Sequence, residues 1–224
     1  MEREGMSFDD ALKGAQQAGY AEANPGLDID GMDNAHKAVV LASLAFGFPI
    51  PMKKVSVEGI RGLAQAEIEN ARGLGYKIKL LAVIKNEDAG IEVRVHPALV
   101  PVDHMMASVD GVFNAIMIDG DIVGQTVYYG RGAGRRPTAS AVISDIAEAA
   151  QGLVSDSLKN RHPVFGRQGK APRFKPPAAS VARYYLRAAL PDKPGMVGKL
   201  TTVLGRHGVS IASVLQKEKH AGKE

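Results

Sequence analysis

An acid-rich stretch that ends in a lysine holds the residue types in this sequence that could do chemistry. Residues 19–37 read GYAEANPGLDIDGMDNAHK, and three of their carboxylates, Glu22, Asp28 and Asp33, precede Lys37. A helix that begins near residue 33 would place Asp33 and Lys37 on one face, because they are four residues apart. A lysine can exchange a proton with a reacting oxygen, and surplus carboxylates suit a cationic group such as a substrate ammonium. The stretch is therefore a candidate substrate site.

A structural ion pair is the alternative explanation of the same two charges. Helical steps from Asp33 and Lys37 reach Val40, Leu41 and Leu44, so the pair is expected in line with the apolar face of the helix. A charge near a core is costly unless it is paired, so a structural pair fits this position as well as catalysis does. The further acids upstream exceed what such a pair requires, which favours a binding site.

Calcium binding is an alternative role for these acids. Asp28 and Asp30 are spaced like the first two ligands of an EF-hand loop. Glycine falls at the fourth position of that loop instead of the sixth, and the twelfth position is Val39 instead of glutamate. The histidines also lack metal-ligand spacing, so no metal site is predicted.

The elements that would position this site follow a simple order. Helices are expected over residues 8–18, 33–46 and 62–72. Alternating apolar residues joined by short polar turns predict strands over residues 76–85, 90–96, 112–118 and 122–130. A long helix at 138–152 is expected to cover the sheet. This order indicates an α+β fold with an antiparallel or mixed sheet covered by helices.

A smaller unit is expected after a basic, proline-rich segment. Six Lys and Arg residues and no Asp or Glu lie between Ser157 and Ser180. Such a run could bind nucleic acid, but its prolines and charge favour a solvated linker. Beyond it, a strand at 183–190, a helix at 196–207 and a strand at 208–217 predict a partial ferredoxin-like βαβ unit, too short to be stable alone.

The composition narrows the class of protein. The chain has 224 residues, 45% hydrophobic and 23% charged, which is typical of globular domains. The longest apolar run, residues 38–51, is too short to span a membrane. Cysteine is absent, which excludes disulfides and thiolate zinc sites and is typical of a reducing, cytoplasmic compartment.

A glycine-rich turn, residues 130–134, precedes the long predicted helix. Its G-x-G-x-G spacing, with no βαβ unit around it, does not match the dinucleotide-binding fingerprint. Pro137 near the start of the helix leaves backbone N–H groups free there. A tight strand-to-helix turn and a ligand contact both explain this stretch.

The acid-rich stretch is part of a longer pattern that resembles a known family. The pattern A-x3-G-Y-A-x2-N-P-x2-D-I-x-G-x-D-x3-K, from Ala15 to Lys37, is similar to the signature of homoserine dehydrogenases. The resemblance continues through HPALVPVDHMMASVDGVFNAIMIDGDIVG and GRGAGRRPTASAVISD. The tail PDKPGMVGKLTTVLGRHGVSIASVLQK is similar to the first part of an ACT domain, a regulatory module.

The resemblance implies an oxidoreductase that uses NADP or NAD and interconverts L-homoserine and L-aspartate 4-semialdehyde, in threonine, methionine and isoleucine biosynthesis. It implies that Lys37 is the proton donor and acceptor and that Glu22 binds the substrate amino group. It implies that Asp28 and Asp33 orient the substrate and the lysine, and that Gly132 lies near the nicotinamide end of the cofactor. A homodimer or homotetramer is implied, with no nucleic-acid or membrane partner.

The resemblance also implies an organisation of the chain. A catalytic, substrate-binding and dimerisation domain is expected at 1–160, a linker at 161–180, and a truncated ACT domain at 181–224. Family members begin with a Rossmann domain, and residues 1–5 are typical of a helix interior, so we expect an internal fragment with negligible turnover alone. The alternative is a non-catalytic amino-acid-binding or assembly module derived from that domain.

Overall fold

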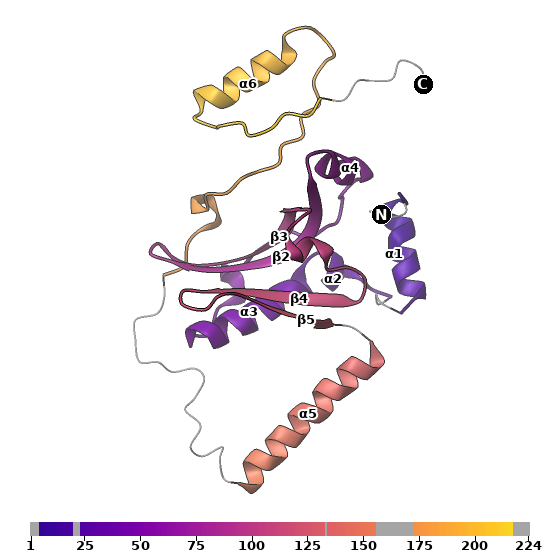
Figure 1. Ribbon diagram of the computed structural model, residues 1–224, viewed down its shortest axis with the longest axis vertical. Helices are drawn as coiled ribbons and strands as arrows, with labels where there is room; N and C mark the ends of the chain where they lie inside the picture. The colour runs from indigo at the N-terminus through magenta and orange to yellow at the C-terminus, as the bar shows by residue number, and fades with distance from the viewer. Residues whose placement is uncertain (1–4, 20–22, 133, 156–172, 217–224) are drawn as a thin grey trace.

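The computed structural model describes residues 5–19, 23–132, 134–155 and 173–216, and its central body of helices and strands holds the acid-rich stretch (Figure 1). The helical elements of this body are α1 (Phe8–Gln17), α2 (Gly26–Ile29), α3 (Met32–Phe46), η1 (Met52–Lys54), α4 (Gln65–Gly73) and η2 (Met105–Ser108). The strands are β1 (Ser56–Val57), β2 (Tyr76–Glu87), β3 (Gly90–Pro101), β4 (Phe113–Gly120) and β5 (Gly124–Arg131). The chain continues through α5 (Arg135–Val154), η4 (Pro177–Ala179) and α6 (Met196–Arg206). This mixture of elements confirms the predicted α+β class.

The main sheet is mixed and has the strand order β1-β3-β2. β2 and β3 pair antiparallel from Tyr76 opposite Pro101 to Glu87 opposite Gly90, so a two-residue turn joins them. The short β1 pairs with β3 in parallel. The long hairpin confirms the two strands predicted here, although β3 continues five residues beyond the predicted end.

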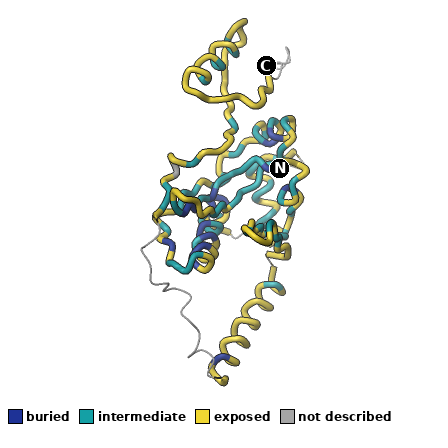
Figure 2. The backbone as a smooth tube through the Cα atoms, turned by 60° about the vertical axis from the view of Figure 1, so that its left-hand side comes forward, coloured by how far each residue is buried: buried dark blue, intermediate teal, exposed yellow. Residues whose placement is uncertain are grey.

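β3 separates two environments because its side chains alternate. Ile91, Val93 and Val95 are at most 4% exposed, and the first two belong to a core cluster with Ala38 and Ala42 of α3. The buried residues of the molecule lie mainly around α3 and this sheet (Figure 2). The packing of β3 against α3 therefore determines where the catalytic candidates on that helix lie.

The apolar face of α3 that carries the Asp33–Lys37 pair is not the buried face. Val40, Leu41 and Leu44, which share the face of the pair, are 57%, 38% and 49% exposed. The buried face consists of small residues, Ala35, Ala38, Ala42 and Ser43, which let the helix backbone approach the sheet closely. The expectation that the pair lies against the core of this chain is therefore wrong.

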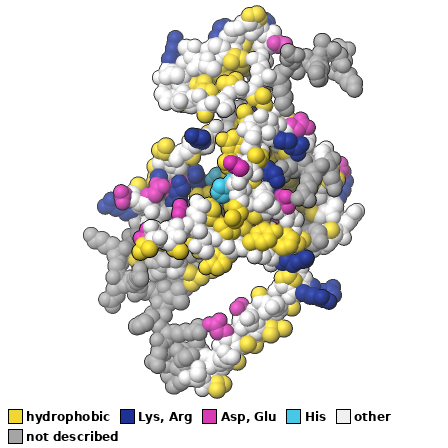
Figure 3. Space-filling view, in the orientation of Figure 1, with side chains coloured by type: hydrophobic (Ala, Val, Ile, Leu, Met, Phe, Trp, Pro, Cys, Tyr) yellow, Lys and Arg dark blue, Asp and Glu magenta, His cyan; other side chains and the backbone are white. Residues whose placement is uncertain are grey.

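β4 and β5 form a second sheet of two strands, which confirms the second predicted hairpin. Ile116 and Tyr128 are direct cross-strand partners, and both are exposed together with Ile118. Figure 3 shows hydrophobic side chains over the hairpin and along α5.

The predicted covering helix does not cover either sheet. α5 extends away from the hairpin (Figure 1), and Gly152 is the only buried residue among those described in it. Val142, Ile143 and Ile146 are 52–66% exposed. The chain changes direction at Gly134, which has a φ of 117° that favours glycine, and the helix leaves the sheet from there. Nowhere in the described ranges is a helix both long and apolar enough to cross a membrane.

The C-terminal unit has its predicted helix, α6, but not its predicted strands. The residues described within 183–190 and 208–216 form no strand. A strand needs a neighbour to accept and donate its ladder hydrogen bonds, and none of the described strands pairs with either segment. An alternating sequence pattern therefore does not by itself produce a strand in these segments.

Part of the predicted solvated linker is bound to the main sheet. The backbone N–H of Ile91 donates to the carbonyl of Arg173 at 2.8 Å, and the N–H of Lys175 donates to the carbonyl of Ile91 at 2.9 Å. Phe174, between them, packs against the core cluster. Residues 173–175 are therefore an edge segment of the sheet instead of a free linker, and residues 161–172 lie outside the described part of the chain.

Candidate active site

The start of α3 is fixed by a glycine. Gly31 has a φ of 81° and is buried, and a Cβ atom there would lie 3.2 Å from Val95 Cγ1 and 3.3 Å from Val57 Cγ1. The left-handed conformation and the close approach both favour glycine, so α2 and α3 can turn tightly against the sheet. This turn determines where Asp33 and Lys37 emerge.

The structure brings Asp33 and Lys37 together. Lys37 Nζ donates to Asp33 Oδ2 at 2.5 Å, within one turn of α3. The lysine side chain is 58% exposed and the aspartate side chain is 39% exposed. The ammonium group is therefore oriented by a carboxylate but remains open to a ligand.

The other two predicted carboxylates are placed differently. Asp28 lies on α2, which packs against α3, and it is exposed. Within the described ranges Asp28 forms no ion pair, and the structure does not join it to Lys37. Glu22 lies outside the described residues. The structure thus joins Asp33 to Lys37, places Asp28 on the adjoining helix, and leaves the position of Glu22 undescribed.

An acid in the same stretch has a partner that the sequence did not reveal. Arg61 binds both carboxylate oxygens of Asp30, Nε to Oδ1 at 2.7 Å and Nη2 to Oδ2 at 2.9 Å. This hydrogen bonding lowers the pKa of Asp30 below its ordinary value. The two residues are 31 positions apart, so no local pattern could have predicted the pair.

Gly132 lies directly after β5, at the end of the hairpin. Its N–H donates to the carbonyl of Val112 at 3.0 Å. A Cβ atom at this position would lie 1.8 Å from Asn114 Nδ2, so the side chain of Asn114 occupies the space beside the glycine. This packing gives a structural reason for glycine here.

The described residues do not fit a complete dinucleotide site. Their two sheets have the orders β1-β3-β2 and β4-β5, and neither is the parallel βαβ arrangement with a glycine-rich turn that binds a dinucleotide. In the described ranges, no group of three or more His, Asp and Glu side chains could hold a metal ion. Lys37 and Asp33 stay the candidates for substrate chemistry that the sequence predicts and the structure brings together.

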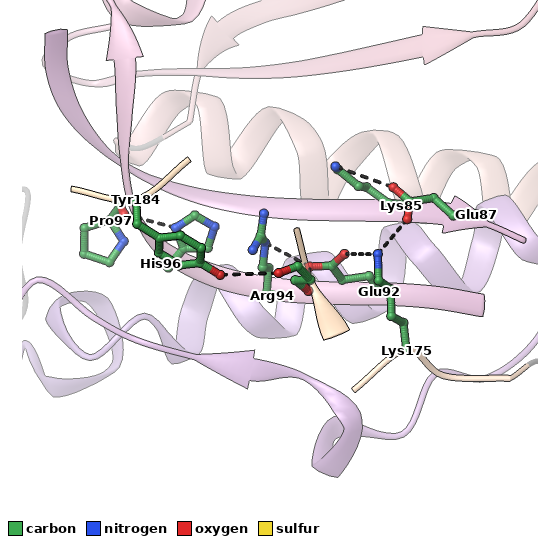
Figure 4. A network of polar contacts seen from close by, with 9 residues as sticks. Lys85, Glu87, Glu92, Arg94, His96, Pro97, Lys175 and Tyr184 are labelled. Atoms are coloured by element: carbon green, nitrogen blue, oxygen red, sulfur yellow. Dashed lines mark hydrogen bonds and ion pairs between the residues drawn. The ribbon is translucent and has the colours of Figure 1, made fainter. Parts of the chain in front are cut away.

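A second charged cluster lies on the opposite side of β3 (Figure 4). Glu92 is 4% exposed, accepts a hydrogen bond from Ser180 Oγ at 2.6 Å and lies 3.1 Å from Arg94 Nε. Lys175 Nζ lies 3.8 Å from Glu92 and donates to Glu87 Oε2 at 2.7 Å. That hydrogen bond raises the pKa of Lys175 and lowers the pKa of Glu87. We call these five residues the Glu92 cluster, and sequence reasoning missed it.

Fold and site together define an α+β domain with a lysine and carboxylates at a helix start, followed by a smaller unit. The sequence model described as homoserine dehydrogenase matches residues 1–147, and the one described as ACT domain matches residues 184–224. The chain belongs to the homoserine dehydrogenase family.

Curated relatives and solved structures agree with this assignment. A homoserine dehydrogenase of Pseudomonas aeruginosa is 44% identical over 221 residues, which cover 97% of this chain and 51% of the relative. One of Helicobacter pylori is 45% identical over 212 residues, 95% of this chain and 49% of the relative. The chain spans about half the length of the curated relatives it matches.

Among solved structures, a homoserine dehydrogenase from Thiobacillus denitrificans matches with a TM-score of 0.79 and 38% identity, covering 97% of this chain and 51% of that chain. A hyperthermophilic archaeal homoserine dehydrogenase in complex with NADPH matches with a TM-score of 0.52 and 32% identity, covering 66% of this chain and 41% of that chain. Both support the α+β catalytic fold.

Proposed function

We propose that this chain is the catalytic part of a homoserine dehydrogenase, which interconverts L-homoserine and L-aspartate 4-semialdehyde with NADP or NAD. The observation that carries the proposal is the Lys37–Asp33 pair, exposed at the start of α3 within the family-matched region. An exposed lysine held by one carboxylate can still reach a ligand, and an exposed pair of this kind contributes little to stability.

Lys37 is proposed to exchange the proton at the reacting oxygen. Its ammonium gives a proton to the carbonyl oxygen of the semialdehyde, and in the reverse direction the neutral amine takes the proton of the homoserine hydroxyl. Asp33 orients the lysine through its hydrogen bond. Hydride transfer belongs to the nicotinamide cofactor, and no step through it is assigned to the described residues.

Glu22 is proposed to bind the substrate ammonium, and Asp28 is proposed to orient the substrate. The position of Asp28 on α2, which packs against α3, supports its role, because a carboxylate there adds negative charge to the region of the site. Gly132 is proposed to lie near the nicotinamide end of the cofactor. Support for the cofactor class comes from the archaeal relative solved with NADPH.

The test joins this chain to the unmatched half of the Pseudomonas aeruginosa relative and measures homoserine oxidation. Lys37→Ala should reduce turnover by about 100-fold or more, while homoserine binding is retained. Lys199→Ala, at an exposed position on α6, is the matched control and should leave turnover unchanged. Unchanged turnover in Lys37→Ala would contradict the catalytic assignment.

A non-catalytic amino-acid-binding or assembly module is the second candidate. The observation that favours it is that neither described sheet has the parallel βαβ arrangement that binds a dinucleotide. In that case the isolated chain would bind homoserine, and Lys37→Ala would leave the turnover of the joined protein unchanged.

The chain is also proposed to act in the cytoplasm as a homodimer or homotetramer, without nucleic-acid or membrane partners. The exposed apolar residues Ile116, Ile118 and Tyr128 on the β4–β5 hairpin support self-association, and the absence of cysteine supports a reducing compartment. Sedimentation of the chain with and without Ile116→Lys would test the oligomer. The proposed domain boundaries are residues 1–160 for the catalytic domain, 161–180 for the linker and 181–224 for the ACT domain.

A further inference from the structure

The acid-rich stretch rests directly on a loop that follows β1. The N–H of Ile60 donates to the carbonyl of Ile29 at 2.7 Å. A Cβ atom on Gly59 would lie 2.2 Å from that same carbonyl oxygen and 2.5 Å from the Cα of Asp30. Backbone therefore meets backbone at this contact, and only glycine permits it.

The loop is itself anchored to the sheet. β1 pairs with Arg94 and Val95 of β3, and the N–H of Glu58 donates to the carbonyl of Val95 at 2.8 Å. Val95 is 1% exposed. Residues 58–61 thus connect a buried part of the sheet to the backbone that lies between Asp28 and Asp33.

Arg61 completes this connection with a side chain. Its guanidinium uses two nitrogens to bind both oxygens of Asp30, and such a two-point pair fixes direction as well as distance. Asp30 stands two residues after Asp28 and three residues before Asp33. Its carboxylate is already occupied, whereas the described structure gives Asp28 no ion pair.

We propose that Arg61, through Asp30, is a positioning residue that holds Asp28 and Asp33 in the arrangement that orients the substrate and Lys37. The proposal rests on the function proposed above. The Asp30–Arg61 pair acts as a clamp on the backbone of the acid-rich stretch, and Arg61 does not touch the substrate.

A clamp and a simple charge effect predict different patterns of binding for two single substitutions. Arg61→Met and Asp30→Asn both break the pair, so a clamp predicts weaker binding in both. A charge effect predicts tighter binding of the substrate ammonium in Arg61→Met, which adds net negative charge near the site. It predicts weaker binding in Asp30→Asn, which removes negative charge there. The double variant separates them further, because a pair that is already broken cannot be broken twice.

The experiment titrates the 224-residue chain with L-homoserine by calorimetry. Each single variant should weaken binding by about two- to five-fold, and the double variant should be no weaker than the singles. Arg206→Met, at an exposed position on α6, is the matched control and should bind like the parent. Unchanged affinity, or opposite changes in the two single variants, would overturn the proposal.

Hydrogen exchange gives a readout that does not depend on homoserine binding. In both single variants the amides of residues 26–37 should exchange faster, while those of α4 are unchanged. Failure of the parent chain to bind homoserine would count against the proposed function alone, and unchanged exchange at residues 26–37 would overturn the clamp in either case.

Discussion

Two charged groups lie on opposite sides of β3, and they differ in how they are made. The Lys37–Asp33 pair arises within one turn of α3, and its side chains are 58% and 39% exposed. The Glu92 cluster joins residues from β2, β3 and the segment after residue 172, and the side chain of Glu92 is 5% exposed. The first group is open to a ligand, whereas the second is satisfied by the chain itself.

The two charged groups are expected to contribute differently to the stability of the fold. An exposed ion pair contributes little to folding, so its residues are free to serve another purpose. A buried carboxylate must keep its partners, because an unpaired charge in the interior costs several kcal/mol. This contrast agrees with the proposal that the α3 pair takes part in substrate chemistry. The Glu92 cluster attaches Lys175 and Ser180 to the main sheet.

The largest expected effect on stability is at the buried Glu92 cluster. Glu92→Ala removes the acceptor of Ser180 and leaves Arg94 without its carboxylate, and it should lower the free energy of unfolding by about 3 kcal/mol. Urea denaturation of the parent and the variant measures this loss. A change below about 1 kcal/mol would mean that the cluster does not hold the fold.

A glycine substitution tests the attachment of the edge segment without removing charge. Gly90 has a φ of 123°, and a Cβ atom there would lie 2.4 Å from the carbonyl oxygen of Arg173. Gly90→Ala should therefore cost about 1–3 kcal/mol and increase hydrogen exchange at the amide of Lys175. Gly198→Ala is the control, because a Cβ atom there would meet nothing within 4 Å. Equal exchange at Lys175 in parent and variant would show that the edge pairing does not depend on Gly90.

The pH dependence of stability should follow the Glu87–Lys175 pair. The pKa of Glu87 is lowered from 4.5 by its hydrogen bond with Lys175, so its contribution is present above that value and is lost as the pH falls through the folded pKa. The pKa of Lys175 is raised from 10.5, so its contribution is present below that value and is lost as the pH rises through the folded pKa. Urea unfolding between about pH 7 and pH 3 should show a smaller acid-induced loss in Glu87→Gln than in the parent. An identical slope in both proteins would contradict this assignment.

The smallest expected effect on stability is at the proposed catalytic pair. Lys37→Met breaks an exposed pair within one helix, and it should change the free energy of unfolding by about 0.5 kcal/mol or less. Thermal and urea denaturation of the isolated chain measure this change. A loss above about 2 kcal/mol would make the pair a structural one and would favour the non-catalytic module.

Local patterns predicted the local parts of this molecule well. The spacing of Asp33 and Lys37 correctly indicated a shared helical face, and alternation with short turns located both hairpins. The same reasoning failed where an element depends on a distant neighbour. It missed β1, expected strands at 183–190 and 208–217, and expected α5 to cover the sheet.

The sequence by itself determined the family, the start of α3 and the pairing of Asp33 with Lys37, because these depend on residue types at fixed short spacing. Only the tertiary structure decided which face of α3 is buried, that Arg61 binds Asp30, and that residues 173–180 close over Glu92. Each of these joins groups that are far apart in the chain. Such contacts depend on how well surfaces pack and on which charges lose their water, and neither property is encoded in a local pattern.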